Sequence, residues 1–553
     1  MRVRDLLNNN VPENTVLVIG AALSGAFSAL EAARRGWRVF LIDKEDKIIP
    51  DSSSSNNECY KLHTGLHYAG NLKTALACLE DSIAYARQIP AECLAGTNDP
   101  NDPCRRGRHF VMSNSLFPPE EIKKVALILQ KRYSELVAKD PKNKVFGEPE
   151  DFIKFLSESD YPYVAKEIPF TDTSTLRKEQ IKVVLGIETG ESQIDINKVR
   201  GYLTREINSH PNISFVPNVQ VLNLSPLSDQ LGYAVTVATP TGKQIWHVPA
   251  IVNCAWQNIE SLSKQLGFYT PDENRVIRVK VCAQVELPPS LRSVNTCIFS
   301  IGPFASFTNL GNGQAVLASE LTTNVGFYRV ESGNRSFELA ELMKTPLNPQ
   351  TGRGAQLSDK IRRECANYLP DLAEAKISKV MLGYVKMTHV PTSYNGSSSL
   401  CQKHSPIHQR LERGVEVESG ALGYIANSGN KMTYTLRNAE AACHILQHHF
   451  QLRESLKQTL SVIKPVVVEK LKKINKKYVN HLTDTLLLNV FKRAILSNSS
   501  DSSPEAVLHD VLSVIEKKER MLALIRSRCY GKKLVSLAAP DPIPAPPQTT
   551  ARL

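Results

Sequence analysis

A short segment near the N-terminus sets the strongest constraint on the fold of this chain. Residues 16–19 (VLVI) form an uninterrupted apolar run, which is typical of a strand buried on both faces. Gly20 ends that run, and residues 25–35 contain helix-forming residues with an alanine-rich face. Gly36 suits the position after a helix, and residues 37–42 are again apolar and rich in β-forming residues. This order predicts a β-α-β unit and therefore an α/β fold with parallel strands.

The turn after the first strand, residues 20–25 (GAALSG), has the position and nearly the spacing of a dinucleotide-binding fingerprint. Gly20 permits a tight turn, and Gly25 permits close packing of the helix on the strand. Ala22 replaces the glycine that lets the backbone approach a pyrophosphate. Asp43 follows the second strand, where its carboxylate can accept hydrogen bonds from ribose hydroxyls. The alternative is a buried strand–helix turn in another α/β fold.

Composition excludes several other classes of protein. The chain has 553 residues, 42% of them hydrophobic and 22% charged, which is ordinary for globular proteins and excludes wholesale disorder or a fibrous repeat. That length favours three or four domains, or fewer larger ones. The cysteine count of 11 is odd and includes no CxxC pair, which disfavours a disulfide framework or a zinc ribbon. Residues 1–10 contain no apolar signal core, and polar residues interrupt the run 16–33, so we expect a soluble cytoplasmic protein.

The net charge of +12 is concentrated near the C-terminus, because residues 451–533 contain 17 Lys and Arg against 8 Asp and Glu. A basic field over the whole surface is therefore not expected, and neither is a nucleic-acid partner. Apolar residues at helical spacing alternate with lysines here, with a break or kink expected at Pro465. The run 470–477 (KLKKINKK) is either a basic helix that docks on the inner face of a membrane or on a protein, or the solvated face of a helix covering the core.

Two further segments resemble a known family. Residues 58–80 (ECYKLHTGLHYAGNLKTALACLE) and residues 423–439 (GYIANSGNKMTYTLRNA) are similar to FAD-dependent oxidoreductases of the D-amino-acid-oxidase superfamily. The nearest branches are the L-2-hydroxyglutarate dehydrogenases and the glycerol-3-phosphate dehydrogenases. Residues 188–197 and 251–255 resemble two more cofactor-domain segments, although Trp256 stands where the family has glycine. The resemblance runs in patches from residue 14 to residue 445, in the family's order.

The resemblance implies a Rossmann-like FAD-binding domain interleaved with an α+β substrate domain, mostly of antiparallel sheet, and followed by a C-terminal helical extension. Within the substrate and cofactor segments we expect several strands, including one over residues 246–253. The expected boundaries are residues 12–90, 191–262 and 386–450 for the FAD-binding domain, 91–190 and 263–385 for the substrate domain, 451–533 for the basic helical extension, and 534–553 for a Pro-rich disordered tail.

The catalytic candidates are two histidines and a lysine. Flavin dehydrogenases need a group that takes the substrate's hydroxyl or amine proton, and histidine suits this because its pKa lies near working pH. His63 matches the family's histidine, and His67 lies four residues further on. Lys431 is similar to a family lysine that approaches the anionic end of the substrate and offsets charge on a reduced flavin. Packing or surface roles remain the alternative for each of these residues.

The resemblance further implies FAD as the cofactor and hydride removal from a small, anionic hydroxy or amino substrate. The alternative function is a binding module with a flavoprotein fold and impaired catalysis. Lys386 replaces the family's carboxylate-binding arginine, so Lys386 and Arg410 are guesses for the substrate's anion, while the substrate, electron acceptor and oligomeric state stay open. His444 and His448 share a helix face without a third ligand, so no metal site is predicted. The expected cofactor-binding residues are Gly20, Ala22, Ser24, Gly25, Asp43, Lys44, Val221, Gly429, Met432 and Thr433.

Overall fold

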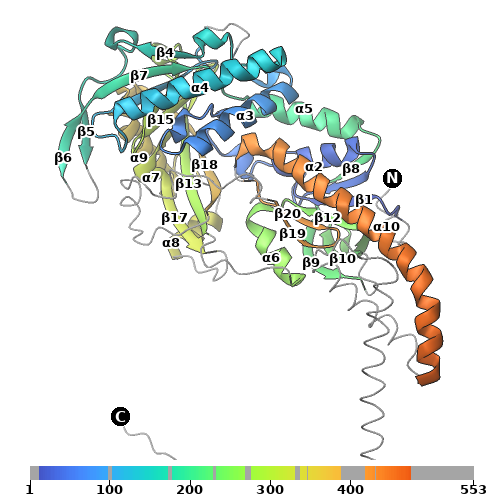
Figure 1. The fold of residues 1–553 in the computed structure, drawn as a ribbon. Coiled ribbons are helices and arrows are strands. Elements are labelled where there is room, and N and C mark those ends of the chain that lie inside the picture. The colour runs from blue at the N-terminus through green and yellow to red at the C-terminus, as the bar shows by residue number, and fades with distance from the viewer. Residues whose placement is uncertain are drawn as a thin grey trace, which may run out of the picture. The chain divides into compact units, whose positions relative to one another are not determined.

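The computed structural model describes residues 11–96, 102–171, 177–227, 232–267, 276–329, 337–344, 347–387, 417–429 and 431–474 (Figure 1). The chain divides into two compact units, Met1–Gln451 and Leu452–Leu553. The described residues do not include Arg410, residues 475–533 of the expected basic extension, or the Pro-rich tail of residues 534–553.

The first sheet of the larger unit is mostly parallel and has the strand order β19-β20-β12-β1-β2-β8. Four neighbouring pairs run parallel, and only the edge strand β19 runs antiparallel to its neighbour. Its strands come from distant parts of the chain, so the sheet is completed only when those parts meet. The strands are β1 (Thr15–Ile19), β2 (Arg38–Ile42), β8 (Ile213–Val216), β12 (Ala250–Asn253), β19 (Val417–Ala421) and β20 (Tyr424–Asn427).

Both faces of this sheet are covered, which explains the uninterrupted apolar run of β1. Val16 and Val18 belong to one core cluster, which includes apolar residues of α2 (Leu23–Arg34) and α5 (Ile196–Ser209). Leu17 and Ile19 belong to another, formed with α6 (Ile259–Gln265) and a three-stranded antiparallel sheet. Alternate side chains of one strand therefore enter two different cores. The three strands are β9 (Gln220–Pro226), β10 (Tyr233–Thr239) and β11 (Gly242–Val248).

The second large sheet has nine strands, in the order β17-β13-β16-β15-β14-β3-β7-β4, with β18 also paired to β13. Only the pairing of β14 with β3 is parallel; the other pairings in this sheet are antiparallel. The predicted fold class, a Rossmann-like domain interleaved with a mostly antiparallel α+β domain, is confirmed. The strands are β3 (Gly107–Met112), β4 (Ile153–Leu156), β7 (Val183–Thr189), β13 (Val276–Glu286), β14 (Thr296–Ser300), β15 (Ala305–Gly311), β16 (Gln314–Ser319), β17 (Asn324–Arg329) and β18 (Lys376–Met387).

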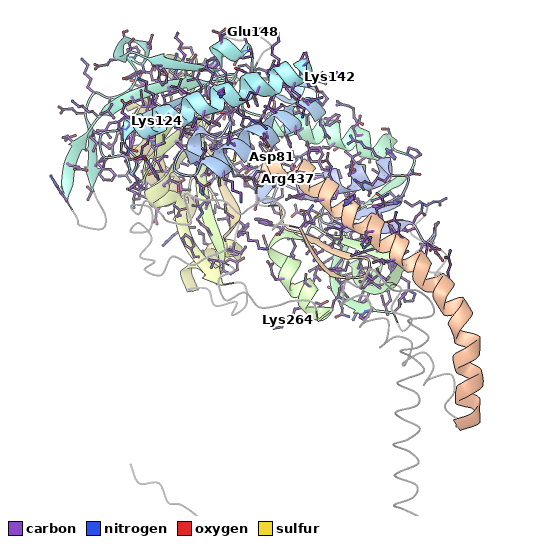
Figure 2. The ribbon with its side chains drawn as sticks, viewed as in Figure 1. Asp81, Lys124, Lys142, Glu148, Lys264 and Arg437 are labelled. Atoms are coloured by element: carbon purple, nitrogen blue, oxygen red, sulfur yellow. The ribbon has the colours of Figure 1, made fainter. Side chains whose placement is uncertain are left out.

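Helices pack around these sheets, and β5 (Ile168–Thr171) and β6 (Lys178–Ile181) form a separate hairpin. An ion pair joins two of the helices: Arg437 Nη1 lies 3.3 Å from Asp81 Oδ2, and both residues are labelled in Figure 2. The pair is partly buried, since the side chains of Arg437 and Asp81 are 21% and 7% exposed. The remaining α-helices are α3 (Leu72–Gln88), α4 (Pro119–Lys139), α7 (Glu320–Thr323), α8 (Phe337–Lys344), α9 (Gly352–Ala366) and α10 (Thr435–Ile474).

Two predictions about local structure need correction, one of them in part. Residues 246–253 do not form one strand, because β11 ends before Pro249 and β12 continues in a different sheet. Proline has no N–H to donate to a sheet ladder, so it marks the point where the chain changes sheets. Of the break or kink expected at Pro465, the break does not occur, since α10 is continuous from Thr435 to Ile474. Among the described helices, none is both long and apolar enough to cross a membrane.

Candidate active site

One cavity of about 580 Å³ brings together the three sequence motifs that were singled out. Its size lies within the range of small-molecule and cofactor pockets. Its wall combines the fingerprint turn, the segment after β2 and the residues that lead into α10. The predicted residues that line it are Gly20, Ala22, Ser24, Asp43, Lys44, His63, His67, Val221, Gly429, Lys431, Met432 and Thr433.

The fingerprint turn depends on two glycines. Gly20 has a φ of +96°, and a Cβ there would lie 2.7 Å from the carbonyl oxygen of Cys254. Gly25 is buried at the start of α2, and a Cβ there would lie 1.7 Å from the carbonyl oxygen of Gly20. The two positions therefore require glycine, one because of its backbone conformation and both because of close packing. Gly25 acts by packing behind the cavity wall, as the fingerprint predicts.

The N-terminus of α2 opens on this cavity. Ala22 is its N-cap residue, and no side chain among the described residues accepts a hydrogen bond from the first turn at that position. Ala22 and Ser24 both line the cavity. Ala22 has a φ of −71°, a conformation that does not require glycine, so its methyl group is accommodated without backbone strain. Uncapped amides and the positive end of the helix dipole can bind a phosphate here.

Asp43 holds the turn together as well as facing the cavity. Its Oδ2 accepts a hydrogen bond of 2.7 Å from the amide of Ala21, and its Oδ1 accepts one of 3.0 Å from the amide of Glu45. Burial raises the pKa of Asp43, and these two amide donors oppose that rise. A carboxylate has about four acceptor positions. Asp43 therefore retains acceptor capacity for ribose hydroxyls after binding the turn.

Trp256, where the related family has glycine, has a positive φ of 50°. Side chains other than glycine pay roughly 1–2 kcal/mol in the left-handed region, so glycine would be less strained at this position. Trp256 lines the cavity and packs against the core of the nine-stranded sheet. Its indole Nε1 is buried and has no hydrogen-bond partner among the described residues. The tryptophan thus forms part of the wall and leaves a buried donor there.

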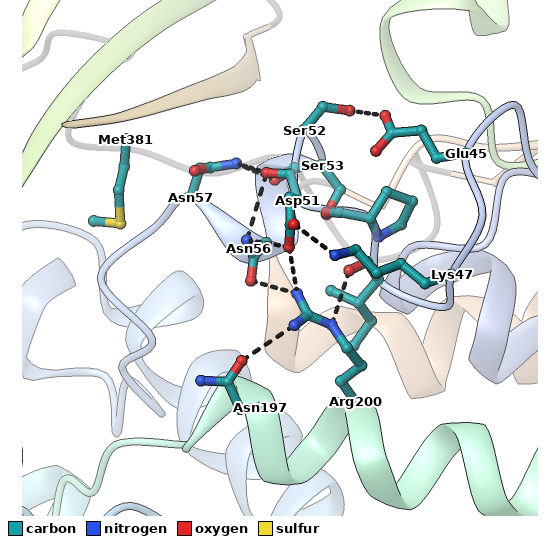
Figure 3. Close-up of polar contacts among 12 residues, drawn as sticks. Glu45, Lys47, Asp51, Ser52, Ser53, Asn56, Asn57, Asn197, Arg200 and Met381 are labelled. Atoms are coloured by element: carbon teal, nitrogen blue, oxygen red, sulfur yellow. Dashed lines mark hydrogen bonds and ion pairs between the residues drawn. The ribbon is translucent and has the colours of Figure 1, made fainter. Parts of the chain in front are cut away.

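The polar loop after β2 is held in place by Arg200 of α5 (Figure 3). The guanidinium donates to the side-chain oxygens of Asp51 at 3.2 Å and Asn56 at 2.7 Å, and to the carbonyl of Ile49 at 3.1 Å. The loop is therefore fixed by polar contacts although it has few apolar residues to pack. Its serines Ser52, Ser53, Ser54 and Ser55 line the cavity and were not predicted as site residues.

His63 lies in a buried cluster that sequence reasoning did not identify. Its Nδ1 is 3.4 Å from Oε2 of Glu191, a fully buried carboxylate that also accepts from the amide of Thr64 at 3.2 Å and lies 3.8 Å from His109 Nε2. Burial lowers the pKa of His63 to about 4, with Glu191 opposing that shift. His67 stacks on His63 with ring centroids 4.9 Å apart. The imidazole of His63 is therefore neutral at pH 7, with Nδ1 toward a carboxylate.

Lys431 lines the cavity but is oriented by neighbouring side chains. Its Nζ lies 3.0 Å from Cys78 Sγ and 3.6 Å from the centre of the Tyr68 ring, a close cation–π contact. Tyr68 also meets both histidine rings edge-on. Lys431 and the two histidines therefore share one aromatic neighbour on the same side of the cavity.

A group of charged residues on the nine-stranded sheet was missed. Arg278 and Lys280 line the cavity from β13, with nitrogens 3.9 and 3.2 Å from the carboxylate of Glu320. These cations lower the pKa of Glu320 to about 2 although burial opposes them, and burial raises the pKa of Glu58 to about 8. Two cations thus face one ionised carboxylate at pH 7, which favours an anionic ligand. The alternation of charged and apolar residues along β13 could have pointed to these cations. Ile277 and Val279, which alternate with them, pack into the core on the other face of the sheet.

Lys386, the sequence-based guess for binding the substrate's anion, has a different role in the structure. It is buried, and its Nζ lies 3.0 Å from Glu260 Oε1 and 3.1 Å from Ser428 Oγ. That ion pair ties β18 to α6. Within the described ranges, no three potential His, Cys, Asp or Glu ligands gather at one point, and His444 and His448 are exposed on α10.

The residues present fit a dinucleotide. The uncapped start of α2 suits a pyrophosphate and Asp43 suits a ribose, while Val221 and its neighbours form the adjoining wall. A Cβ on Gly429 would lie 2.6 Å from Ser24 Oγ, so the closing motif approaches the fingerprint closely. The N-terminal turns of two helices, α2 and α10, contribute residues to one cavity.

Comparison with known proteins identifies the fold. No family model and no curated protein sequence matches the chain. Among solved structures, L-amino acid deaminase from Proteus vulgaris matches with a TM-score of 0.50 and 13% identity, covering 79% of this chain and 94% of that one. Glycine oxidase from Geobacillus kaustophilus matches with a TM-score of 0.46 and 12% identity, covering 79% and 94%. L-alpha-glycerophosphate oxidase from Mycoplasma pneumoniae, solved with FAD bound, matches with a TM-score of 0.46 and 12% identity, covering 78% and 95%.

At such identities a structural match establishes the fold and not the activity. The deaminase match covers nearly the whole of that protein, so it includes both large sheets of this chain and not the β-α-β unit alone. The fold expected from the sequence motifs is thereby confirmed: this chain has the fold of L-amino acid deaminase from Proteus vulgaris.

Proposed function

We propose that the chain is an FAD-dependent oxidoreductase that removes hydride from a small, anionic substrate bearing a hydroxyl or an amine. The observation that carries this proposal is the single cavity that joins the α2 N-terminus and Asp43 to His63, Lys431 and the cations of β13. Similar folds in an amino acid deaminase and in a glycerophosphate oxidase solved with FAD support it. When bound, the flavin supplies the acceptor for the hydride.

The first part of the cavity binds the cofactor. The amides of the first turn of α2, next to Ala22 and Ser24, hold the pyrophosphate. Asp43 accepts from the ribose hydroxyls while its bond to the Ala21 amide keeps the turn closed. Met432 and Thr433, just before α10, line the same cavity, so the positive end of that helix would offset negative charge on a bound flavin.

The second part binds and deprotonates the substrate. Arg278 and Lys280 attract its anionic group, since they outnumber the carboxylate of Glu320 that they share. His63 accepts the hydroxyl or amine proton at Nε2, because Nδ1 faces Glu191 and keeps its own proton there. Lys431 adds positive charge beside the two histidines. These residues bind and orient the substrate and move one proton.

A visible spectrum of the purified chain, followed by an anaerobic substrate panel, tests this proposal. We expect flavin absorption bands, or uptake of added FAD, and bleaching by at least one anionic hydroxy or amino acid. No flavin uptake would exclude the proposal. Flavin uptake without bleaching by any hydroxy acid, glycerol phosphate or amino acid would favour the alternative, a binding module with impaired catalysis.

The pH dependence of flavin reduction should reflect the buried environment of His63. A base must be neutral to accept a proton, so the rate falls as pH decreases through the pKa of His63. That pKa is about 4, so we expect the rate to change less than about twofold between pH 7 and pH 5.5. An ordinary histidine would give a loss of roughly eightfold over that interval. Anaerobic stopped-flow measurements distinguish these results.

A further inference from the structure

Lys61 is a buried cation at the wall of the cavity, and the proposed function does not use it. The residue is only 7% exposed, and it lines the cavity. Its Nζ donates a hydrogen bond of 2.7 Å to Ser306 Oγ on β15. Within the described ranges, no carboxylate oxygen lies within 4.0 Å of that nitrogen. The hydroxyl of Ser306 is therefore its one described side-chain partner, and it carries no charge.

The backbone of Lys61 is fixed by a second segment of the chain. The amide of Leu62 donates to the carbonyl of Ser192 at 2.9 Å, and Lys61 pairs with Gln193 in an antiparallel bridge. Leu62 packs into the core cluster that includes residues of α2, whereas Lys61 lines the cavity. Neighbouring side chains of an extended segment point to opposite sides, so the bridge directs Lys61 away from that core and toward β15.

The other cations on this wall already have a carboxylate. Lys280 Nζ lies 3.2 Å from Glu320 Oε1, and Arg278 Nη1 lies 3.9 Å from Glu320 Oε2. Glu58 is close to Lys61 in the sequence, but burial raises its pKa to about 8, so it is mainly uncharged at pH 7. Buried charges in proteins are normally paired. Lys61 is thus a buried charge whose counter-ion the described part of the chain does not supply.

Lys61 acts at a different place in the cavity from Arg278 and Lys280. Its partner Ser306 lies on β15, and β16 separates that strand from β13. Neighbouring strands are about 4.8 Å apart, so β13 and β15 are separated by roughly 10 Å. Ala318 of β16, which pairs with Ser306, also lines the cavity, so the cavity extends across both positions.

We propose that Lys61 and Ser306 form an anion-binding subsite, in which a carboxylate or phosphate group of a ligand is the missing counter-ion of the lysine. An ammonium group has three protons to donate, so two remain after the bond to Ser306. The hydroxyl of Ser306 accepts from Lys61 and keeps its own proton to donate to the same anion. Charge-assisted hydrogen bonds of this kind are shorter and stronger than neutral ones.

An anion in this subsite would also act on the proposed base. Burial is the main reason that the pKa of His63 falls to about 4, and the charges of Lys431 and Lys61 add to that shift. An anion bound at Lys61 would offset part of this effect. The subsite itself does not depend on hydride transfer, so its test can fail or succeed separately from that of the proposed function.

The full chain, supplemented with FAD to fill the proposed dinucleotide site, provides the test. Its melting temperature is measured by differential scanning calorimetry while sodium phosphate or sodium acetate replaces sodium chloride at constant ionic strength. A ligand that binds only the folded state raises the melting temperature. We expect such a rise with at least one anion: with phosphate alone if the subsite takes phosphate groups, and with acetate alone if it takes carboxylates. No rise with either anion would overturn the proposal.

Variants assign the response to Lys61. In Lys61→Met, the anion concentration that gives half the rise should increase at least about tenfold, because a charge-assisted hydrogen bond is lost. The melting temperature of this variant without anion should not fall below that of the wild type, since an unpaired buried charge is removed. Ser306→Ala should weaken anion binding by a few-fold. Lys144→Met, at an exposed lysine paired with Glu148, is the control for net charge and should respond as the wild type does.

The anion response decides the outcome. A half-saturating concentration in Lys61→Met within about threefold of the wild type would overturn the proposal, whatever the melting temperature of the variant. If Lys61→Met does not fold, an unchanged response in Ser306→Ala overturns it instead. Weaker FAD binding in Lys61→Met with an unchanged anion response would mean that Lys61 binds the cofactor, which also contradicts the assignment.

Discussion

Gly25→Ala is expected to abolish cofactor binding and to destabilise the larger unit. The added Cβ would lie 1.7 Å from the carbonyl oxygen of Gly20, so α2 must move away from the turn. Overpacking of this kind costs about 3 kcal/mol or more in free energy of unfolding. The same movement displaces the amides proposed to hold the pyrophosphate, so we expect FAD affinity to fall by at least about 100-fold, since each 1.4 kcal/mol is tenfold. Denaturant unfolding and FAD titration measure the two effects.

Ala22→Gly is the matched control in the same turn. Ala22 has an ordinary backbone conformation and its position is at the cavity wall, so removing its methyl group should leave FAD affinity within a few-fold of the wild type. Wild-type stability and FAD affinity in Gly25→Ala would show that the turn is not packed as described.

His63→Asn is expected to reduce the rate of anaerobic flavin reduction by about 10²–10⁴-fold, because that is the usual contribution of a positioned general base. Flavin content should stay at the wild-type level, since the fingerprint turn and Asp43, and not His63, are the groups proposed to bind the cofactor. The measurement is stopped-flow bleaching with a substrate that reduces the wild-type protein. His444→Asn, at an exposed position on α10, is the control and should behave as the wild type does. A near wild-type rate in His63→Asn would mean that another group accepts the substrate's proton, with Glu58 as the next candidate.

Glu191→Gln tests how His63 is positioned. Glu191 does not reach the substrate in this assignment; it orients the imidazole through Nδ1. Its negative charge raises the pKa of His63, so its removal should move the acid limb of the rate to still lower pH, while the rate at pH 7 falls about tenfold. Glu191→Asp should partly restore both properties. A general loss of packing would lower stability without moving the pH limb.

Much of the cofactor end of the site could be predicted from local sequence. The apolar run, Gly20, Gly25 and Asp43 belong to one β-α-β unit and its flanking turns. Each of these residues is explained by its position relative to residues close to it in the chain. The closing motif was found because Gly429, Met432 and Thr433 resemble those of a known family, and these residues line the same cavity.

The substrate end was much less predictable. Glu191 contacts His63 across a long separation in the chain, and no spacing in the sequence joins them. Lys386 lies in the sequence near the position where the similar family binds its substrate. Only tertiary packing placed Glu260 beside it, so that Lys386 forms an ion pair instead. Arg278 and Lys280 alternate with apolar residues on β13, yet alternation cannot say whether the polar face meets solvent or a cavity.

The sequence by itself determined a β-α-β unit whose turn suits a phosphate, because strand burial, glycine positions and helix dipoles act between residues close in the chain. The tertiary structure decided where the proposed catalytic groups meet, since the parallel sheet is assembled from three separate stretches and the nine-stranded sheet forms the opposite wall. Charges and thiols acquire their chemistry from burial and from neighbours brought together by that assembly. For this reason the protonation of His63 follows from the folded chain and not from its motifs.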